Sequence, residues 1–401
     1  MEKRPWPLFV SAPLLGLSQS ILVVFTPIFI DKTKLSIESL AMLMSLGSIL
    51  FLFSIPIWAK LSLRLGYAQV LLRGILGFSV SFIVMLLALW GSASLQWPLL
   101  WVVLILIISR LIYGMTASAI VPSCQAWLTE LSHVKQTMKK LAELSATMAV
   151  GRLIGPLLAM FLIWLGWLAP ILFLCFAPLI CLFSVFRFSR SIQTHIGNTE
   201  LEATNKDLRQ SKLDNKFAHS LLICITLICI TYSSVTFLLT PMVQETMHYS
   251  SEETSQYLSL LMTLAAVTMV ISHGLTSRLN KVDHFKMMLL ANMMLLLSLT
   301  LMQLAIPHIL FIAVPLLSGA FAILQLQITT LLCQLAGKGC KAIATGLVSK
   351  YQTVGYGLGA GVLWLTGSDI NTCLHILSIL ALVQLASLII WKLKVVEQVI
   401  D

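Results

Sequence analysis

The sequence predicts an all-α membrane protein in which twelve transmembrane helices form two six-helix bundles. Hydrophobic residues make up 58% of the 401 residues and charged residues only 10%, which is too little charge for a soluble chain of this length. The apolar residues fall into twelve runs of about 20 residues, the length that crosses the hydrocarbon core of a bilayer. One long polar stretch separates the first six runs from the last six.

The runs follow one another with short polar breaks. Those of the first half lie near 7–30, 38–59, 70–91, 98–127, 141–165 and 168–186. Those of the second half lie near 218–242, 254–275, 285–306, 309–335, 342–366 and 370–391. We interpret 187–217 as a cytoplasmic linker between an N-terminal bundle, 1–186, and a C-terminal bundle, 218–401. The first run follows Lys3 and Arg4 as in a signal peptide, but prolines interrupt it and no cleavage site closes it. We therefore expect a retained first helix.

The basic residues predict the orientation. If the N-terminus is cytoplasmic, the outside loops hold only Lys32 and Lys34, and the spans hold Arg110 and Arg152, which leaves 22 of the 26 Lys and Arg residues on the cytoplasmic side. Lys and Arg are enriched in cytoplasmic loops. The sequence therefore predicts a multi-pass protein of the cytoplasmic (inner) membrane with both termini in the cytoplasm. The net charge of +10 reflects these loops and does not indicate a nucleic-acid partner.

The two halves also repeat each other. Three pairs of segments match in the same order on equivalent spans: Thr26-Pro27 with Thr240-Pro241, Leu61–Leu65 with Leu275–Leu279, and Val150-Gly151-x-x-x-Gly155 with Val354-Gly355-x-x-x-Gly359. The first two pairs are offset by 214 residues and the third by 204. Such internal echoes are typical of transporters built from duplicated bundles.

Three motifs in the first half carry a family resemblance. The loop after the second run reads Ala59-Lys60-Leu61-Ser62-Leu63-Arg64-Leu65-Gly66-Tyr67-Ala68, the fourth run contains Arg110-Leu-Ile-Tyr-Gly114, and the fifth contains Gly151-Arg152-Leu-Ile-Gly155-Pro156-Leu-Leu-Ala159. Together with the twelve runs, they resemble the major facilitator superfamily and, within it, the twelve-helix drug:proton antiporter branch. The third resembles a motif that is typical of exporters.

The resemblance implies a major facilitator fold and secondary transport by alternating access. It assigns conformational roles to Arg64, Gly66, Gly151, Gly155 and Pro156, and to Arg278 in the repeat. Glycines four apart also simply let two helices approach closely. Leu63 stands where the family has an acidic residue. In the family that carboxylate helps to hold the two halves together in the outward-facing state, and leucine cannot form the same contact. The spans that line the pathway in this family offer Gln19, Tyr113, Tyr232, Ser233 and Gln325.

Arg110 and Arg152 are the candidate substrate-binding cations. Helix rise places them about 18 and 17 Å into their spans, near the midplane, where a lipid-facing arginine costs about 3 kcal/mol by the low estimate. None of the sixteen Asp and Glu residues lies deep in a span. The spans therefore contain two buried cations and no buried acidic residue to pair with them. A bound anion would supply the missing negative charge, because guanidinium groups hold carboxylates by two hydrogen bonds. The alternative is a structural charge satisfied by backbone carbonyls and hydroxyls.

These observations predict an exporter of a small organic anion, with a carboxylate-type siderophore as the preferred cargo. Arginine does not titrate, so Glu130 and Glu143 are the candidates for proton coupling by antiport. Glu143 is also suited to an ordinary surface pair with Lys139 or Lys140 one turn earlier. We expect a monomer surrounded by lipid, with the substrate and protons as its partners.

Two rival functions remain open. In a broad-specificity drug:proton antiporter, both arginines would be structural. An intramembrane enzyme is the remote alternative, but the sequence has no G-x-S-x-G, no H-E-x-x-H and no paired carboxylates within the spans, so it offers no recognisable catalytic group. The eight cysteines form no C-x-x-C pair. We therefore expect neither a metal nor a cofactor.

Overall fold

The computed structural model describes residues 5–131, 134–191, 216–278, 283–336, 341–367 and 369–400, and every regular element among them is helical. In the first half the helices are α1 (Trp6–Ser11), α2 (Pro13–Thr33), α3 (Ile37–Leu65), α4 (Tyr67–Leu95), α5 (Leu99–Ala117), α6 (Ile120–Glu130), α7 (Val134–Leu165) and α8 (Ala169–Ser191). In the second half they are α10 (Lys216–Met247), α11 (Ser251–Arg278), α12 (His284–Gln303), the short 3₁₀ helix η2 (Pro307–Ile309), α13 (Leu310–Ala336), α14 (Lys341–Thr366) and α15 (Ile370–Ile400). The predicted all-α fold is confirmed.

The helices follow the predicted spans closely. Two predicted runs are each built from two helices, α1 with α2 and α5 with α6. Among the described residues, 11 helical segments are long and apolar enough to cross a membrane. The remaining predicted run, 342–366, forms α14, which at 26 residues is about 39 Å long but contains more polar residues and glycine. Of the predicted linker, residues 192–215 lie outside the described residues, while its two ends continue α8 and begin α10.

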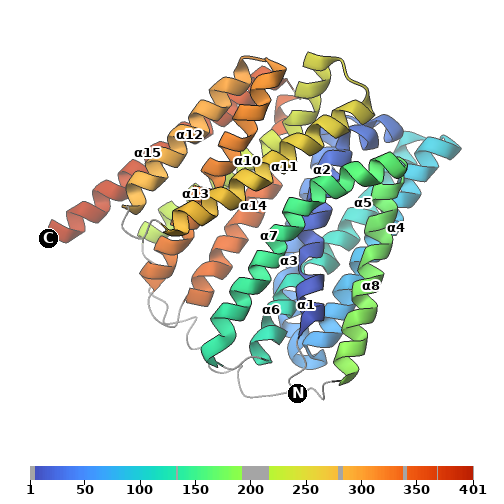
Figure 1. Ribbon diagram of the computed structural model, residues 1–401, viewed down its shortest axis with the longest axis horizontal. Coiled ribbons are helices and arrows are strands. Elements are labelled where there is room, and N and C mark those ends of the chain that lie inside the picture. Colours follow the sequence, from blue (N-terminus) through green and yellow to red (C-terminus); the bar gives the residue numbers. More distant parts are fainter. Residues whose placement is uncertain are drawn as a thin grey trace. The chain divides into compact units, whose positions relative to one another are not determined.

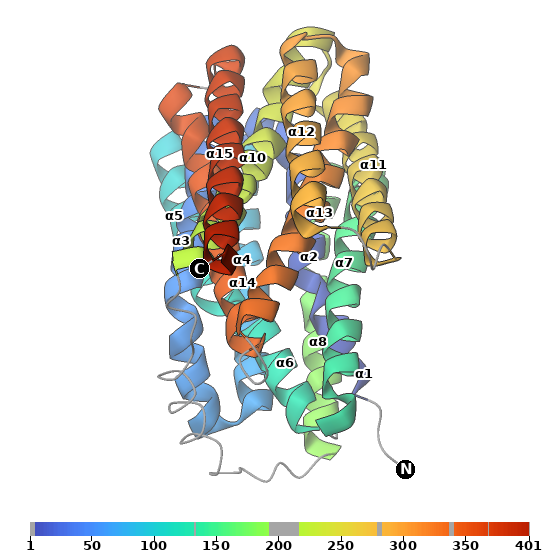
Figure 2. The same cartoon turned by 90° about the vertical axis from the view of Figure 1, so that its left-hand side faces the viewer.

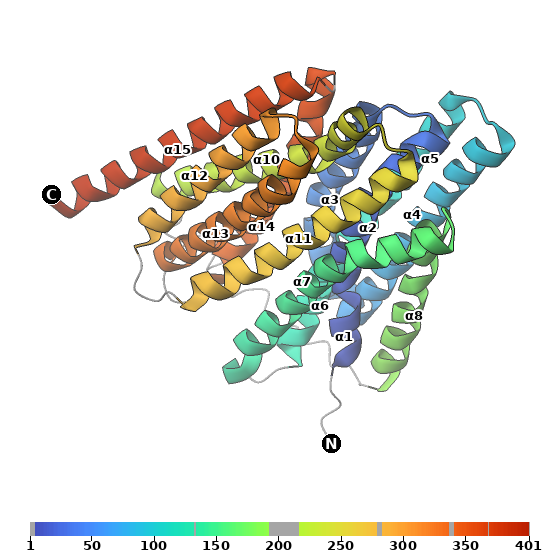
Figure 3. The same cartoon turned by 45° about the horizontal axis from the view of Figure 1, so that its top comes forward.

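The chain divides into two compact units. Unit 1 contains α1 to α8 and the first part of α11, residues 250–263. Unit 2 contains α10, the rest of α11 and α12 to α15. In unit 1, α2 packs against α7 (Figure 1), and α4 packs against α5 and α8 (Figure 3). Unit 2 repeats these pairings with α10 against α14, and with α12 against α13 and α15, while α10 also lies beside α15 (Figure 2).

Apolar side chains cover the outside of these helices as well as the inside. Trp164 is 78% exposed and Phe53 is 67% exposed, whereas Phe78 and Phe82 are fully buried. Such exposed rings suit a bilayer, where lipid offers no hydrogen bonds and polar groups must be satisfied within the protein. Many Ser and Thr hydroxyls donate to a backbone carbonyl of their own helix. For example, Thr33 donates to the carbonyl of Phe29 at 2.6 Å.

Polar residues begin several helices. Ser36 caps α3 through the backbone N–H of Ser39 at 3.3 Å, and Asp283 caps α12 through that of Phe285 at 2.9 Å. Such side-chain oxygens satisfy N–H groups that the first turn of a helix leaves free. Between α3 and α4 the chain turns at Gly66, with φ of 81° and ψ of 153°. This conformation is almost restricted to glycine, which explains why the loop motif has glycine there.

Candidate functional site

The contact between α2 and α7 depends on the glycines of the exporter-like motif. A Cβ added to Gly151 would lie 2.7 Å from the backbone oxygen of Pro13, and one added to Gly155 would lie 2.6 Å from Cβ of Ser20. No side chain fits at either distance. The two glycines therefore let the backbones of α2 and α7 approach closely, as small residues do in other membrane helix pairs.

Unit 2 contains the same contact between α10 and α14. A Cβ on Gly355 would lie 2.6 Å from the oxygen of Thr226, and one on Gly359 would lie 2.6 Å from the oxygen of Ile230. The third repeated segment of the sequence therefore performs the same packing role in each unit.

A proline and a serine lie at the centre of the contact in unit 1. Pro156 has no N–H, so the carbonyl of Arg152, four residues earlier, loses its partner within α7. The Ser20 hydroxyl of α2 donates to this carbonyl at 3.2 Å. Ser259, from the part of α11 that belongs to unit 1, donates to the oxygen of Pro156 at 2.8 Å.

The side chain of Arg152 lies at this same contact between α2 and α7. It is half-buried, and its stem runs over Gly16 of α2, where an added Cβ would lie 2.9 Å from Cγ of Arg152. Within the described residues, its guanidinium has no hydrogen-bond or ion-pair partner. The contact between α2 and α7 therefore holds a cation that no described residue of unit 1 neutralises.

Arg110 lies in a different environment within unit 1. It is 3% exposed, and its Nη2 and Nη1 atoms lie 2.8 Å from Sδ of Met85 and 3.4 Å from Sδ of Met44. The rings of Phe82 and Tyr113 lie 5.7 and 5.2 Å from its guanidinium carbon. Sulfur is a weak acceptor, but the two rings stabilise the cation by cation–π attraction. No carboxylate contacts Arg110 among the described residues.

The structure brings Tyr113 together with Arg110. The other neutral and acidic candidates of the first half are exposed. Gln19 is exposed on α2. Glu130 and Glu143 are exposed on α6 and α7, and the side chain of Lys139, the suggested partner of Glu143, lies outside the described residues.

The candidates of the second half lie in unit 2. Tyr232 stacks on Phe321 with ring centroids 4.5 Å apart. Ser233 donates to the oxygen of Tyr356 at 3.0 Å, and Gln325 is half-buried in α13.

The loop motif lies at the end of α3. Leu63 and Arg64 are exposed there. Its repeat ends α11 at Arg278, whose side chain lies outside the described residues. In the part of the chain that the structure describes, no group of three or more His, Cys, Asp and Glu residues could hold a metal ion.

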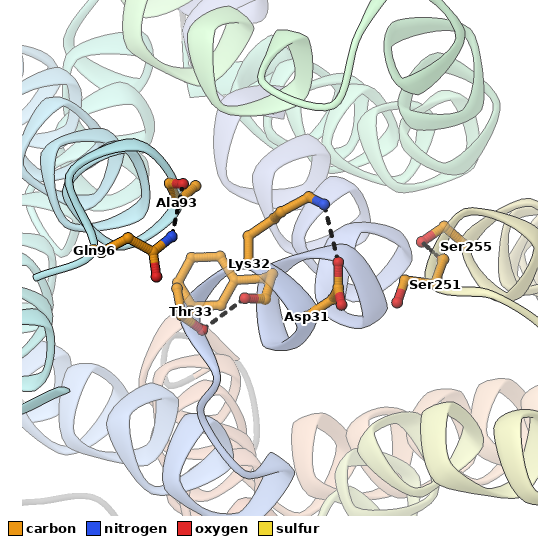
Figure 4. Close-up of polar contacts among 8 residues, drawn as sticks. Asp31, Lys32, Thr33, Ala93, Gln96, Ser251 and Ser255 are labelled. Atoms are coloured by element: carbon orange, nitrogen blue, oxygen red, sulfur yellow. Dashed lines mark hydrogen bonds and ion pairs between the residues drawn. The ribbon is translucent and has the colours of Figure 1, made fainter. Parts of the chain in front are cut away.

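Charged groups also gather at the end of α2 in unit 1. Figure 4 shows Lys32 directed at Asp31, at 3.0 Å, beside Thr33 and Gln96. Lys32 also lies 5.8 Å from the ring of Trp167. Asp31 is exposed and Lys32 is half-buried, and ion pairs this accessible to solvent contribute little to stability. Among the described residues, the ion pair therefore lies at the end of a helix, away from both arginines.

Sequence reasoning missed two residues of the site, Gly16 and Ser20. Pro156 could have pointed to this contact from the sequence. A proline within a helix predicts that the carbonyl four residues earlier, here that of Arg152, needs a donor from outside its helix. Which hydroxyl satisfies that carbonyl depends on how α2 is rotated against α7, and the sequence does not contain that information.

Two helical units with a repeated glycine contact, an apolar surface and, among the described residues, eleven segments long and apolar enough to cross a membrane define a multi-pass integral membrane protein. The chain belongs to the Major Facilitator Superfamily, whose family model matches residues 8–360. It is 31% identical over 237 residues to the multidrug resistance protein MdtG of Proteus mirabilis (strain HI4320). The match covers 57% of this chain and 54% of that protein, so the chain spans about half the length of this curated relative.

Solved structures of low identity share the fold. A bacterial homologue of the human lysosomal transporter Spinster, in an inward-facing and occupied conformation, superposes with a TM-score of 0.73 at 12% identity, over 96% of both chains. A D-xylose-proton symporter superposes with a TM-score of 0.72 at 14% identity, also over 96% of both chains. Its membership of the Major Facilitator Superfamily makes the chain a transporter and not an enzyme, as predicted, and its small-molecule substrate is the remaining question.

Proposed function

We propose that this transporter exports a small organic anion and that Arg152 binds it. The observation that carries the proposal is the guanidinium of Arg152, which has no partner among the described residues although it lies on a membrane-crossing helix. An unpaired arginine within a membrane span is costly unless a partner or water compensates it. A carboxylate supplies the missing charge and accepts two parallel hydrogen bonds from the guanidinium.

The proposal rests on Arg152 rather than on Arg110. Methionine sulfurs and aromatic rings enclose Arg110, and only 3% of its surface is exposed, so we assign it to the stability of unit 1. Tyr113 is part of the same enclosure. The substrate-facing roles of Gln19, Tyr232, Ser233 and Gln325 remain proposals of the family resemblance.

Export, rather than import, is supported by the Gly151–Ala159 motif. We propose that transport proceeds by alternating access in the cytoplasmic membrane, with both termini in the cytoplasm, as the distribution of Lys and Arg indicates. If protons drive it, Glu130 and Glu143 are exposed to accept them. A carboxylate-type siderophore finds no support among the related proteins, so the proposal names only the class of organic anions.

The test compares binding of carboxylates and of their neutral esters to purified protein. We expect citrate or carboxyfluorescein to bind, and triethyl citrate not to bind. Arg152→Ala should weaken the binding by roughly a hundredfold, because a few kcal/mol of charge-assisted hydrogen bonding is lost. Arg152→Lys should be impaired as well, since an ammonium lacks the planar two-bond geometry. Arg190→Ala, which removes an exposed arginine at the end of α8, is the matched control and should bind normally. A well-folded Arg152→Ala protein with unchanged affinity would contradict the proposal.

A second function is favoured by one observation. The relative from Proteus mirabilis is named a multidrug resistance protein, and it matches more than half of this chain. The second proposal is therefore broad-specificity drug efflux by proton antiport. It expects export of ethidium and of unrelated lipophilic compounds that is unaffected by Arg152→Ala. Failure of every carboxylate to bind, together with ethidium export, would select this function over the first.

A further inference from the structure

We infer that Ser20 is a positioning residue: its hydroxyl replaces the N–H group that Pro156 lacks and so holds the backbone of α7 at Arg152. The hydrogen bond itself does not depend on which substrate is transported. Its consequence for binding rests on the proposed function of Arg152.

The first step concerns the backbone of α7. In an α-helix the N–H of residue 156 would donate to the carbonyl of residue 152. Proline removes this donor, and its ring also presses on the same carbonyl, which bends the helix. Within a packed contact between two membrane helices, a neighbouring side chain is the natural replacement for the donor. The carbonyl of Arg152 therefore needs a hydroxyl from a neighbouring helix, and Ser20 supplies it at 3.2 Å.

The second step explains why Ser20 can reach the carbonyl. Gly155 lies one residue before the proline, and a Cβ there would overlap Cβ of Ser20 at 2.6 Å. Gly16 lies one turn before Ser20, and a Cβ there would come within 2.8 Å of the oxygen of Met148. The absence of both side chains lets α2 lie directly against the bend of α7.

The duplicated half of the chain contains an internal comparison. Ser233 donates to the oxygen of Tyr356 at 3.0 Å, just as Ser20 donates to that of Arg152. Four residues after Tyr356, however, stands Ala360, which has an N–H group. The serine bond of unit 2 is thus an additional bond to a carbonyl that its own helix can satisfy. Of these two serine bonds, the one in unit 1 replaces a missing donor.

The third step connects this bond to the side chain. The carbonyl that Ser20 satisfies and the guanidinium that has no partner among the described residues belong to the same residue. Any shift of the backbone at Arg152 also moves the stem that lies over Gly16. Ser20 therefore acts on a bound anion through Arg152, and not by contacting the anion itself.

The decisive test is a double-mutant cycle on thermal stability. Ser20→Ala in the native sequence should lower the Tm of the purified protein by about 2–4 °C, because a carbonyl loses its donor. In a Pro156→Ala background the substituted alanine supplies its own N–H to the carbonyl, so the same change should have almost no effect. Ser20→Thr keeps the hydroxyl and should retain the native Tm. Ser233→Ala should lower Tm less than Ser20→Ala does. Equal losses from Ser20→Ala in both backgrounds would overturn the inference.

Binding of citrate is the second readout, and it separates positioning from general stability. Ser20→Ala should weaken citrate binding about five- to tenfold, and Ser20→Thr should restore it. Ser298→Ala, which removes a comparable hydroxyl-to-carbonyl bond of 2.8 Å between α12 and α13, should leave it unchanged. If Arg152→Ala has no effect on citrate, the proposed function fails while the thermal cycle still tests the hydrogen bond. If Arg152→Ala abolishes binding and Ser20→Ala leaves it intact, positioning by Ser20 is wrong. If the yield of Ser20→Ala is too low, Ser20→Cys, which retains only a weak donor, takes its place in both measurements.

Discussion

Ser20 on α2 and Arg152 on α7 are joined by a hydrogen bond of 3.2 Å from the serine hydroxyl to the arginine carbonyl. The serine crosses to the one carbonyl of α7 that Pro156 deprives of its helical donor. Ser233 and Tyr356 form the corresponding pair in the second unit. Gly151 and Gly155 let α2 and α7 approach closely where the first bond lies. Gly355 and Gly359 do the same for α10 and α14 where the second bond lies.

Replacing the contact glycines should separate the two helices. Gly155→Ala would place a methyl group 2.6 Å from Cβ of Ser20, and Gly359→Ala would place one 2.6 Å from the oxygen of Ile230. Overpacking of this kind typically costs about 1–3 kcal/mol, so we expect a clear fall in Tm for each variant. Gly346→Ala is the control, since an added Cβ there meets nothing within 4 Å. A fall of the same size in the control would show that the contacts are not the cause.

The turn between α3 and α4 should not tolerate a side chain at Gly66. Its φ of 81° and ψ of 153° cost a residue with a Cβ about 1–3 kcal/mol. We expect Gly66→Ala to lower Tm although no atom lies within 4 Å of the added Cβ. Gly361→Ala has the same open space in a helical conformation and should be neutral. Thermal unfolding of both variants therefore separates backbone strain from crowding.

Arg110 should act on stability more than on binding. In Arg110→Lys, an ammonium on a flexible stem cannot reproduce the contacts with Met44, Met85 and both rings, so a charge stays buried with fewer partners. Tm should fall. Arg110→Met removes the charge, fills the space and should fold better than the lysine variant. Citrate affinity of folded Arg110→Met should stay within about twofold of the native value. A hundredfold loss would instead place Arg110 in the anion site.

Leu63→Asp restores the acidic residue that the family has in its loop motif. Leu63 is 40% exposed, so an aspartate there remains solvated and the protein should fold with an unchanged Tm. We expect the variant to favour the outward-facing state, measured as faster labelling of a cysteine introduced on the outer side of the pathway. Slower labelling, or loss of folding, would mean that Leu63 takes part in a contact other than the one the family motif implies.

Topology can be tested by labelling single cysteines in a variant that lacks the eight native ones. A cysteine at position 190, at the exposed end of α8, should react only from the cytoplasm. A cysteine at position 248, in the exposed turn after α10, should react only from outside. Reaction of both from the outside would contradict the twelve-span arrangement and the orientation inferred from Lys and Arg.

The sequence alone determined the helices. Its apolar runs match the observed helices closely because hydrophobic length and polar breaks are local properties that a bilayer selects directly. The run at 342–366 was found in this way although α14 is less apolar than the other spans. The repeated glycines were also recognisable, because duplication leaves a fixed offset between equal segments.

Only the tertiary structure decided which side chains meet. Arg110 and Arg152 looked alike in the sequence, since both lie about halfway along an apolar run. In the structure, Arg110 is enclosed by sulfur and aromatic groups. Arg152 lies one turn before a helical proline, and its guanidinium has no partner in the part of the chain that the structure describes. The partner of each depends on how its helix is rotated and how closely its neighbours approach. Those quantities follow from packing between helices that lie far apart in the chain, so no local pattern around either arginine contains them.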